Sequence, residues 1–107
     1  MLWNLDEVYK ALDIKKKINE NFLFNEISID SREINKKALF IPIKGKNYDG
    51  HKFIDTVARK GVKACLIEKK KKHLIKNKKI LLIEVDNTFN SLKKLALCAK
   101  NRIRNLK

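Results

Sequence analysis

The sequence predicts an α/β domain in which a small mixed, partly parallel sheet is flanked by helices. From residue 27 onward, short apolar runs alternate with segments whose apolar residues recur every three or four positions. The chain has 107 residues, of which 44% are hydrophobic, with only three glycines and one proline, and this composition is typical of a folded chain. Its length indicates a single domain over residues 1–107.

A first helix is expected to begin after Asn4. Asn is a preferred N-cap residue, and Asp6 and Glu7 suit the positive first turn of a helix. Apolar side chains then recur at helical spacing, and this pattern fades near residues 13–17. Residues 19–24 fit either a short strand or a loop, and the spacing does not choose between them.

Two short strands and a polar loop are expected next. Residues 27–29 alternate in polarity and predict a strand that ends in the polar turn 30–32. Residues 38–43 form a second apolar run, in which Pro42 lacks a backbone donor and indicates an edge position or an irregular strand end. Residues 44–50 form a polar loop, and its two glycines permit unusual backbone angles or the close approach of a ligand.

The second half of the chain continues the alternation. Residues 51–60 predict a helix, with Gly61 as a left-handed C-cap, and residues 64–67 predict a strand. Residues 68–79 are expected to form a solvated basic connector that contains four consecutive lysines. Residues 80–85 form the most hydrophobic strand, which we expect at the centre of the sheet.

A last helix is expected over residues 87–104. Asp86 or Asn87 is the predicted cap. The predicted apolar stripe of this helix consists of Phe89, Leu92, Leu95, Ala96, Ala99 and Ile103.

The chain is strongly basic, with 26 basic and 12 acidic residues and a net charge of +14. Residues 54–107 carry +12 of this charge. A reader of nucleic-acid bases would be richer in Arg, whose planar fork binds guanine and phosphate bidentately, but only 4 of the basic residues are Arg. We therefore interpret the charge as a bias of the amino-acid composition that leaves a solvated basic face, and we keep a basic nucleic-acid-binding module as the alternative function.

The motifs of catalysis and metal binding are missing from the sequence. The phosphate-binding pattern G-x-x-x-x-G-K-[ST] does not occur, so these residues alone are not expected to hydrolyse ATP. Cys65 and Cys98 stand singly in apolar runs, which is typical of small buried hydrophobes in a reducing compartment. No metal-ligand spacing is present. We expect no catalytic residue, no metal and no cofactor in this chain.

The N-terminal residues and the apolar runs indicate a cytoplasmic location. Acidic residues stand where a signal peptide carries basic ones, and the longest apolar runs are only a few residues. We therefore expect no association with a membrane.

Two polar segments are the candidate ligand site. In the first, Arg32 and Ser31 offer donors to a phosphate, and Asp30 can hold the guanidinium in place. The same three residues also suit an ordinary turn, and on their own they favour it. The second segment offers cations, amide groups and an aromatic face through Lys44, Gly45, Lys46, Asn47, Tyr48, Asp49 and His51. Taken alone, it is equally consistent with a polar surface loop.

Together these segments resemble the N-terminal domain of the Mur ligases, the ATP-dependent amide ligases that build the peptidoglycan stem peptide. The resemblance rests on Asp30-Ser31-Arg32, on residues 39–45, on residues 49–54, and on Ala58 and Gly61. Trp3 and the run Ile83–Phe89 favour the member that joins D-alanyl-D-alanine to UDP-N-acetylmuramoyl-tripeptide over the preceding ligase of the pathway.

The resemblance implies that the chain docks the UDP end of UDP-N-acetylmuramoyl-tripeptide for peptidoglycan synthesis, and so serves cell shape and cell division. Ser31 and Arg32 would lie near the uridine or the diphosphate. Residues 46–48 would occupy the place of the uracil pocket, while residues 49–51 would shape the loop. ATP and magnesium would serve the full-length enzyme, through a central ATPase domain and a C-terminal domain that this chain lacks.

One position departs from the family pattern. Families of this type usually have Gly immediately before Ala38, where this chain has Lys37. A left-handed turn there would strain Lys, so we expect the local turn to differ.

Overall fold

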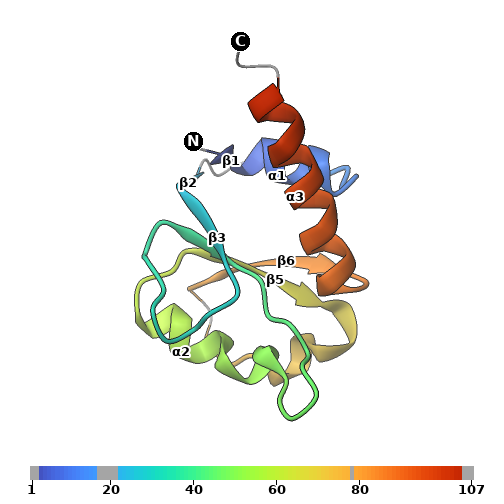
Figure 1. Cartoon of the computed structure of the whole chain (residues 1–107). Coiled ribbons are helices and arrows are strands. Elements are labelled where there is room, and N and C mark those ends of the chain that lie inside the picture. Colours follow the sequence, from blue (N-terminus) through green and yellow to red (C-terminus); the bar gives the residue numbers. More distant parts are fainter. Residues whose placement is uncertain (1–2, 17–21, 78, 105–107) are drawn as a thin grey trace.

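A four-stranded parallel sheet lies at the centre of the molecule (Figure 1). The computed structural model describes residues 3–16, 22–77 and 79–104. The strands β3 (Glu26–Ser28), β4 (Ala38–Phe40), β5 (Ala64–Glu68) and β6 (Leu81–Val85) are ordered β3-β4-β5-β6. Separately, β1 (Trp3–Asn4) pairs antiparallel with β2 (Leu23–Phe24), so a short strand lies within the ambiguous stretch 19–24.

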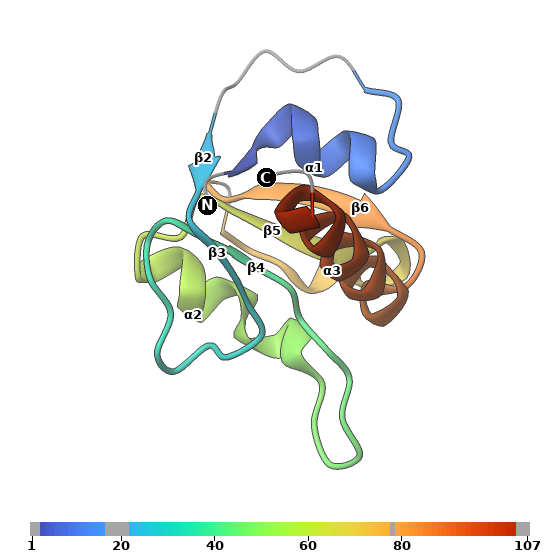
Figure 2. The ribbon, with the colours of Figure 1, turned by 45° about the horizontal axis from the view of Figure 1, so that its top comes forward.

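Helices cover both faces of the sheet, and the predicted α/β fold is therefore confirmed. The helices α1 (Leu5–Ala11) and α3 (Thr88–Arg104) lie on one face, whereas α2 (Ile54–Arg59) lies on the other (Figures 1 and 2). Each face encloses a buried apolar core, one packed against α1 and α3 and the other against α2. Two short 3₁₀-helices, η1 (Gly50–Phe53) and η2 (Lys69–Leu74), complete the fold.

The predicted helix ends are confirmed at three positions. Asn4 accepts a hydrogen bond from the Glu7 backbone N–H at 2.8 Å, and the Glu7 side chain accepts one from the Asn4 backbone N–H at 3.0 Å. Asn87 caps α3 by accepting from the Asn90 backbone N–H at 2.8 Å. Gly61 has a φ of 95°, the left-handed C-cap that its place after α2 requires.

The prediction that residues 80–85 form the central strand is wrong, because β6 is an edge strand. All five residues of β5 are buried, whereas Glu84 of β6 is exposed and Leu81 and Leu82 are only half-buried. A hydrophobic run shows that a strand packs on a core, but it does not report how many neighbouring strands it has.

The predicted stripe of α3 is wrong at Phe89, Ala96 and Ile103, which are exposed. The buried Glu68 side chain bonds the Thr88 backbone N–H at 3.1 Å, which fixes how the helix is rotated and turns Phe89 outward. Towards its C-terminal end, α3 extends past the sheet (Figure 1), and Ile103 near that end is 62% exposed.

The turn before β4 avoids the left-handed conformation at Lys37. Among the described residues, only Asp13 and Gly61 have a positive φ. The side chain of Asn35 accepts from the Lys37 backbone N–H at 2.7 Å, and its carbonyl accepts from the Ala38 N–H at 3.0 Å. The local turn therefore differs from a glycine turn, as expected.

Only the first half of the apolar run 38–43 forms a strand. The strand β4 stops at Phe40, and the buried Pro42 lies just beyond it, so Pro42 marks an irregular strand end. None of the helices in the described part of the chain is both long and apolar enough to cross a membrane.

Candidate functional site at the carboxyl edge of the sheet

A cleft of about 500 Å³ lies where the segments following β3 and β4 meet. Ligands of open α/β sheets bind beyond the carboxyl ends of the strands, and this cleft has that position. The polar wall of the cleft is formed by Asp30, Ser31 and Arg32. Its other wall is largely apolar and consists of Ile29, Phe40, Tyr48, Gly50 and Phe53.

Asp30 orients Arg32 on the polar wall. The Asp30 Oδ1 atom accepts from Arg32 Nε at 3.2 Å and from the Arg32 backbone N–H at 2.9 Å, and Oδ2 accepts from Nη2 at 3.4 Å. The hydrogen bonds from Arg32 hold the pKa of Asp30 below its usual range, and Asp30 raises the pKa of Arg32. The Arg32 side chain is 87% exposed. A guanidinium has five N–H donors, so Arg32 keeps donors for an anionic ligand after it has paired with Asp30.

Lys60, at the end of α2, holds the backbone of the same turn. Its ammonium donates to the carbonyl oxygen of Ser31 at 2.7 Å and to that of Arg32 at 3.1 Å. These two hydrogen bonds tie the turn at residues 30–32 to the end of α2 and so restrict the position of the polar wall.

Tyr48 supplies the aromatic part of the apolar wall. Its side chain is 55% exposed, and its ring centroid lies 6.3 Å from that of Phe53 with an interplanar angle of 59°. An exposed ring beside a cation can stack on a planar heterocycle while the cation binds an attached phosphate.

Tyr48 lies on a hairpin formed by residues 43–50, which projects from the body of the molecule (Figure 2). The Gly45 N–H donates to the Tyr48 carbonyl at 2.7 Å, and the Gly50 N–H donates to the Ile43 carbonyl at 3.0 Å. Lys44 and Asp49 face each other as an isolated antiparallel bridge.

His51 is buried beneath this hairpin and has structural partners on both sides of its ring. Its Nε2 atom accepts from the Glu68 backbone N–H at 3.1 Å, so the ring proton is assigned to Nδ1, which lies 2.7 Å from Asp49 Oδ1. Asp49 also accepts from the His51 backbone N–H at 3.0 Å. These contacts give His51 a supporting role in the hairpin, and its contact with a ligand stays a prediction.

Asp49 and Lys71 form an ion pair below the hairpin. Burial raises the pKa of Asp49, but the hydrogen bonds from Lys71 and His51 outweigh it and hold this pKa well below its usual range. The hydrogen bond to Asp49 likewise raises the pKa of Lys71 despite partial burial. Lys71 Nζ also lies 3.4 Å from Glu68 Oε1, so one ammonium joins the hairpin to the end of β5.

The prediction of a solvated basic connector holds for most of the described residues between 69 and 79, which are exposed, but it is wrong at Lys71. Lys71 is partly buried between two carboxylates, Lys69 pairs with Asp86 at 3.5 Å, and Lys72 pairs with Glu84 at 3.1 Å. Because these lysines neutralise acids of the same chain, the segment is less available to a polyanion than its charge alone suggested.

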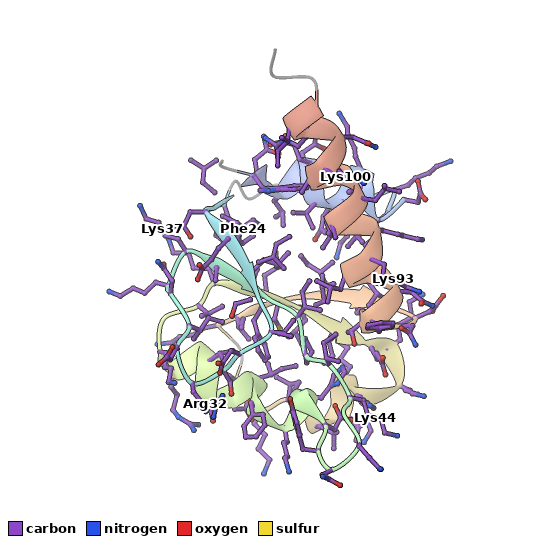
Figure 3. All side chains as sticks on the ribbon, in the orientation of Figure 1. Phe24, Arg32, Lys37, Lys44, Lys93 and Lys100 are labelled. Carbon is purple, nitrogen blue, oxygen red and sulfur yellow. The ribbon has the colours of Figure 1, made fainter. Side chains whose placement is uncertain are left out.

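The structure gathers some of the predicted site residues and separates others. Four of them line the cleft described above, namely Asp30, Ser31, Arg32 and Tyr48. Lys46 and Asn47 are exposed near the hairpin tip, and Lys44, Gly45, Asp49 and His51 do not line the cleft. Arg32 and Lys44 lie well apart in Figure 3.

Sequence reasoning missed Ile29 and Phe53 as cleft residues, together with the supporting lysines. Phe53 lies inside the segment 51–60, for which the sequence predicts a helix, and its position five residues after Tyr48 is the available signal that the two rings lie near each other. Lys60 and Lys71 have no local signal, since they lie 29 and 22 positions from the residues that they hold.

The described residues do not fit an ATP or magnesium site. Within residues 3–16, 22–77 and 79–104, no group of three His, Cys, Asp or Glu side chains could hold a metal ion. The whole sequence also lacks the glycine-rich loop that cradles nucleotide phosphates.

A comparison with known protein families shows which family the chain belongs to. Residues 23–99 match the family described as Mur ligase family, catalytic domain. The chain belongs to the Mur ligase family. The resemblance to the N-terminal domain of these ligases, stated from the residues of the cleft and hairpin, is thereby confirmed.

Individual relatives fall into two classes of ligase. The chain is 36% identical over 97 residues to a UDP-N-acetylmuramoyl-tripeptide--D-alanyl-D-alanine ligase of Rickettsia prowazekii, covering 91% of this chain and 20% of that protein. It is 36% identical over 99 residues to a UDP-N-acetylmuramoyl-L-alanyl-D-glutamate--2,6-diaminopimelate ligase of Clostridium tetani, covering 86% and 20%. A UDP-N-acetylmuramoyl-tripeptide--D-alanyl-D-alanine ligase of Bacillus subtilis is 32% identical over 77 residues, covering 72% of this chain and 16% of that protein. The chain thus spans about a fifth of the length of these relatives.

Proposed function

We propose that this chain is the substrate-docking domain of an ATP-dependent amide ligase that adds D-alanyl-D-alanine to UDP-N-acetylmuramoyl-tripeptide in the cytoplasm. Its task is to bind the UDP end of the nucleotide substrate. The observation that carries the proposal is the cleft that both Arg32 and the exposed Tyr48 line. The relatives of the D-alanyl-D-alanine class support the choice of substrate.

In this proposal the two walls have separate roles. Tyr48 stacks on the uracil ring, and Arg32 with Ser31 donates hydrogen bonds towards the diphosphate. Asp30 keeps the guanidinium in place, and the contact is made far from the peptide end of the substrate. Binding energy from this remote part holds the tripeptide carboxylate where the rest of the ligase acts on it.

Reaction chemistry is assigned to the rest of the ligase. ATP and magnesium supply the activation of the carboxylate in the full-length enzyme, and no step through them is assigned to this chain. The remaining domains of the same ligase and the nucleotide substrate are the proposed partners.

The proposal is tested by an amide-resolved NMR titration of the chain with UDP-N-acetylmuramoyl-tripeptide. We expect shifts at Ser31, Arg32 and residues 44–51. Arg32→Ala removes a charge-assisted hydrogen bond and should weaken binding about tenfold or more, which corresponds to about 1.5–3 kcal/mol. Lys100→Ala, a change of an exposed lysine on α3, is the control for the loss of one positive charge.

The alternative basic nucleic-acid-binding module predicts a different pattern in the same experiment. Shifts confined to residues 69–79 and 93–107, reproduced by any polyanion and weakened by salt, would favour it and overturn the proposal. Undiminished binding of the UDP-sugar by Arg32→Ala would show that the site is misassigned.

A further inference from the structure

We propose that Lys71 is a positioning residue for ligand binding: its ammonium fixes Asp49, and through Asp49 it fixes Tyr48 on the wall of the cleft. The inference rests on the proposed function, since it concerns the ligand that Tyr48 is proposed to contact.

The hairpin that bears Tyr48 needs an anchor outside itself. It projects from the sheet and its tip residues are exposed (Figure 2). Inside it, the Gly45 N–H donates to the Tyr48 carbonyl and the Gly50 N–H donates to the Ile43 carbonyl. An isolated two-stranded hairpin is marginally stable at best in water, so its orientation depends on what holds its base.

Lys71 holds that base from another part of the chain. Its side chain is only 16% exposed, and it binds Asp49 Oδ2, one residue after Tyr48. The same ammonium approaches Glu68, whose other carboxylate oxygen accepts from the Thr88 backbone N–H at 3.1 Å. Lys71 therefore connects the hairpin to the end of β5 and, through Glu68, to the start of α3.

The two carboxylate oxygens of Asp49 have different partners. Removal of the Lys71 side chain can therefore change the orientation of Tyr48 without unfolding the hairpin. His51 binds Oδ1 through both its ring and its backbone N–H, whereas Lys71 binds Oδ2. Loss of Lys71 leaves the contacts of His51 in place. The hairpin then stays attached but is held at one side only, and Tyr48 samples more orientations that a ligand must restrict at a cost in affinity.

Lys72 offers a matched control within the same 3₁₀-helix. It also pairs with one carboxylate, that of Glu84 at 3.1 Å, but its side chain is 54% exposed and the pair lies outside the hairpin. Lys72→Met therefore removes the same charge and one ion pair without altering the support of Tyr48.

The experiment compares Lys71→Met, Lys71→Arg and Lys72→Met with the unaltered chain. The Kd for UDP-N-acetylmuramoyl-tripeptide is measured by NMR titration, and the Tyr48 ring signals and the hydrogen exchange of the Gly45 and Gly50 amides are measured without ligand. We expect Lys71→Met to raise the Kd about threefold to tenfold, the range set by ordering one side chain, and to speed exchange at both glycines. Lys71→Arg should recover most of the affinity, and Lys72→Met should stay within about twofold of the unaltered chain.

The outcomes separate this inference from the proposed function. If the unaltered chain shifts at the cleft and Lys71→Met binds with the same Kd and unchanged Tyr48 signals, the inference is overturned while the proposed function stands. If the unaltered chain gives no shifts at the cleft, both are overturned. Where Lys71→Met loses its native circular dichroism, Lys71→Gln takes its place, because its neutral and shorter side chain removes the ion pair with Asp49 while keeping a polar group, and an unchanged Kd for that variant overturns the inference.

Discussion

Lys60 and Ser31 lie 29 positions apart in the sequence, yet the Lys60 ammonium donates to the Ser31 carbonyl oxygen at 2.7 Å. Through this bond, the last turn of α2 holds the polar wall of the cleft. A buried backbone hydrogen bond would give the same restraint, but here a flexible exposed side chain supplies it, and so a single substitution can remove it.

Lys60→Met should loosen the turn at residues 30–32 with little loss of stability. An exposed ammonium contributes only about 0.5–1 kcal/mol through such bonds, so the unfolding free energy should fall by no more than that. The amide signals of Ser31 and Arg32 should broaden or shift, and affinity for the UDP-sugar should fall severalfold. Lys70→Met, at an exposed lysine of η2, is the control, and equal affinity of the two variants would contradict the role given to Lys60.

Glu68→Ala should be among the most destabilising single changes in the chain. The Glu68 side chain is buried, accepts from the first backbone N–H of α3 at Thr88 and lies beside Lys71. Its loss leaves that backbone donor unpaired and removes one of the two carboxylates around the Lys71 ammonium. We expect a loss of about 2–3 kcal/mol, which is a fall in Tm of roughly 10 °C or more for a domain of this size. Thermal unfolding of Glu68→Ala and of Glu84→Ala, which removes an exposed carboxylate paired with Lys72, makes the comparison. Equal Tm values would show that burial at Glu68 has no energetic consequence.

Local patterns in the sequence predicted the elements and one wall of the site. Asn4, Asn87 and Gly61 each act through neighbours within a few residues, and their roles as helix ends followed from residue type and position. Asp30 and Arg32 are two positions apart, so their pairing was likewise accessible.

Contacts between segments that are distant in the sequence could not be predicted from such local patterns. The edge position of β6 depends on which strands pair, and hydrophobicity carries no information on strand order. The same limit applies to Lys71, where a run of four lysines indicated a solvated loop. Only the fold shows that the third of them reaches Asp49 and Glu68 while its neighbours pair elsewhere.

Stability should fall as the pH drops below about 4, and Asp49 should account for part of this fall. Its pKa is lowered in the folded chain, so in acid the unfolded chain, with an ordinary carboxyl pKa near 3.9, takes up the proton first. The stabilisation is present above that pH and is lost as the pH falls towards the lowered folded value. Asp49→Asn should be about 1–2 kcal/mol less stable at pH 7 but should lose less stability between pH 5 and pH 3. Urea unfolding at pH 7, 5, 4 and 3 measures this, and parallel pH profiles for the two chains would refute the assignment.

Gly50→Ala should open the base of the hairpin, whereas Gly45→Ala should not. A Cβ atom at Gly50 would lie 2.9 Å from the Ile43 backbone nitrogen and 3.1 Å from its carbonyl oxygen, and neither backbone atom can move without breaking the bond between Gly50 and Ile43. At Gly45 the nearest atom is a ring carbon of Tyr48 at 3.3 Å, and an exposed side chain can turn aside. Overpacking of this kind costs about 1–3 kcal/mol, so we expect Gly50→Ala to unfold at a clearly lower urea concentration than Gly45→Ala, which should lose less than about 1 kcal/mol while shifting the Tyr48 ring signals. Coincident urea midpoints would mean that the hairpin base yields more easily than its backbone contacts indicate.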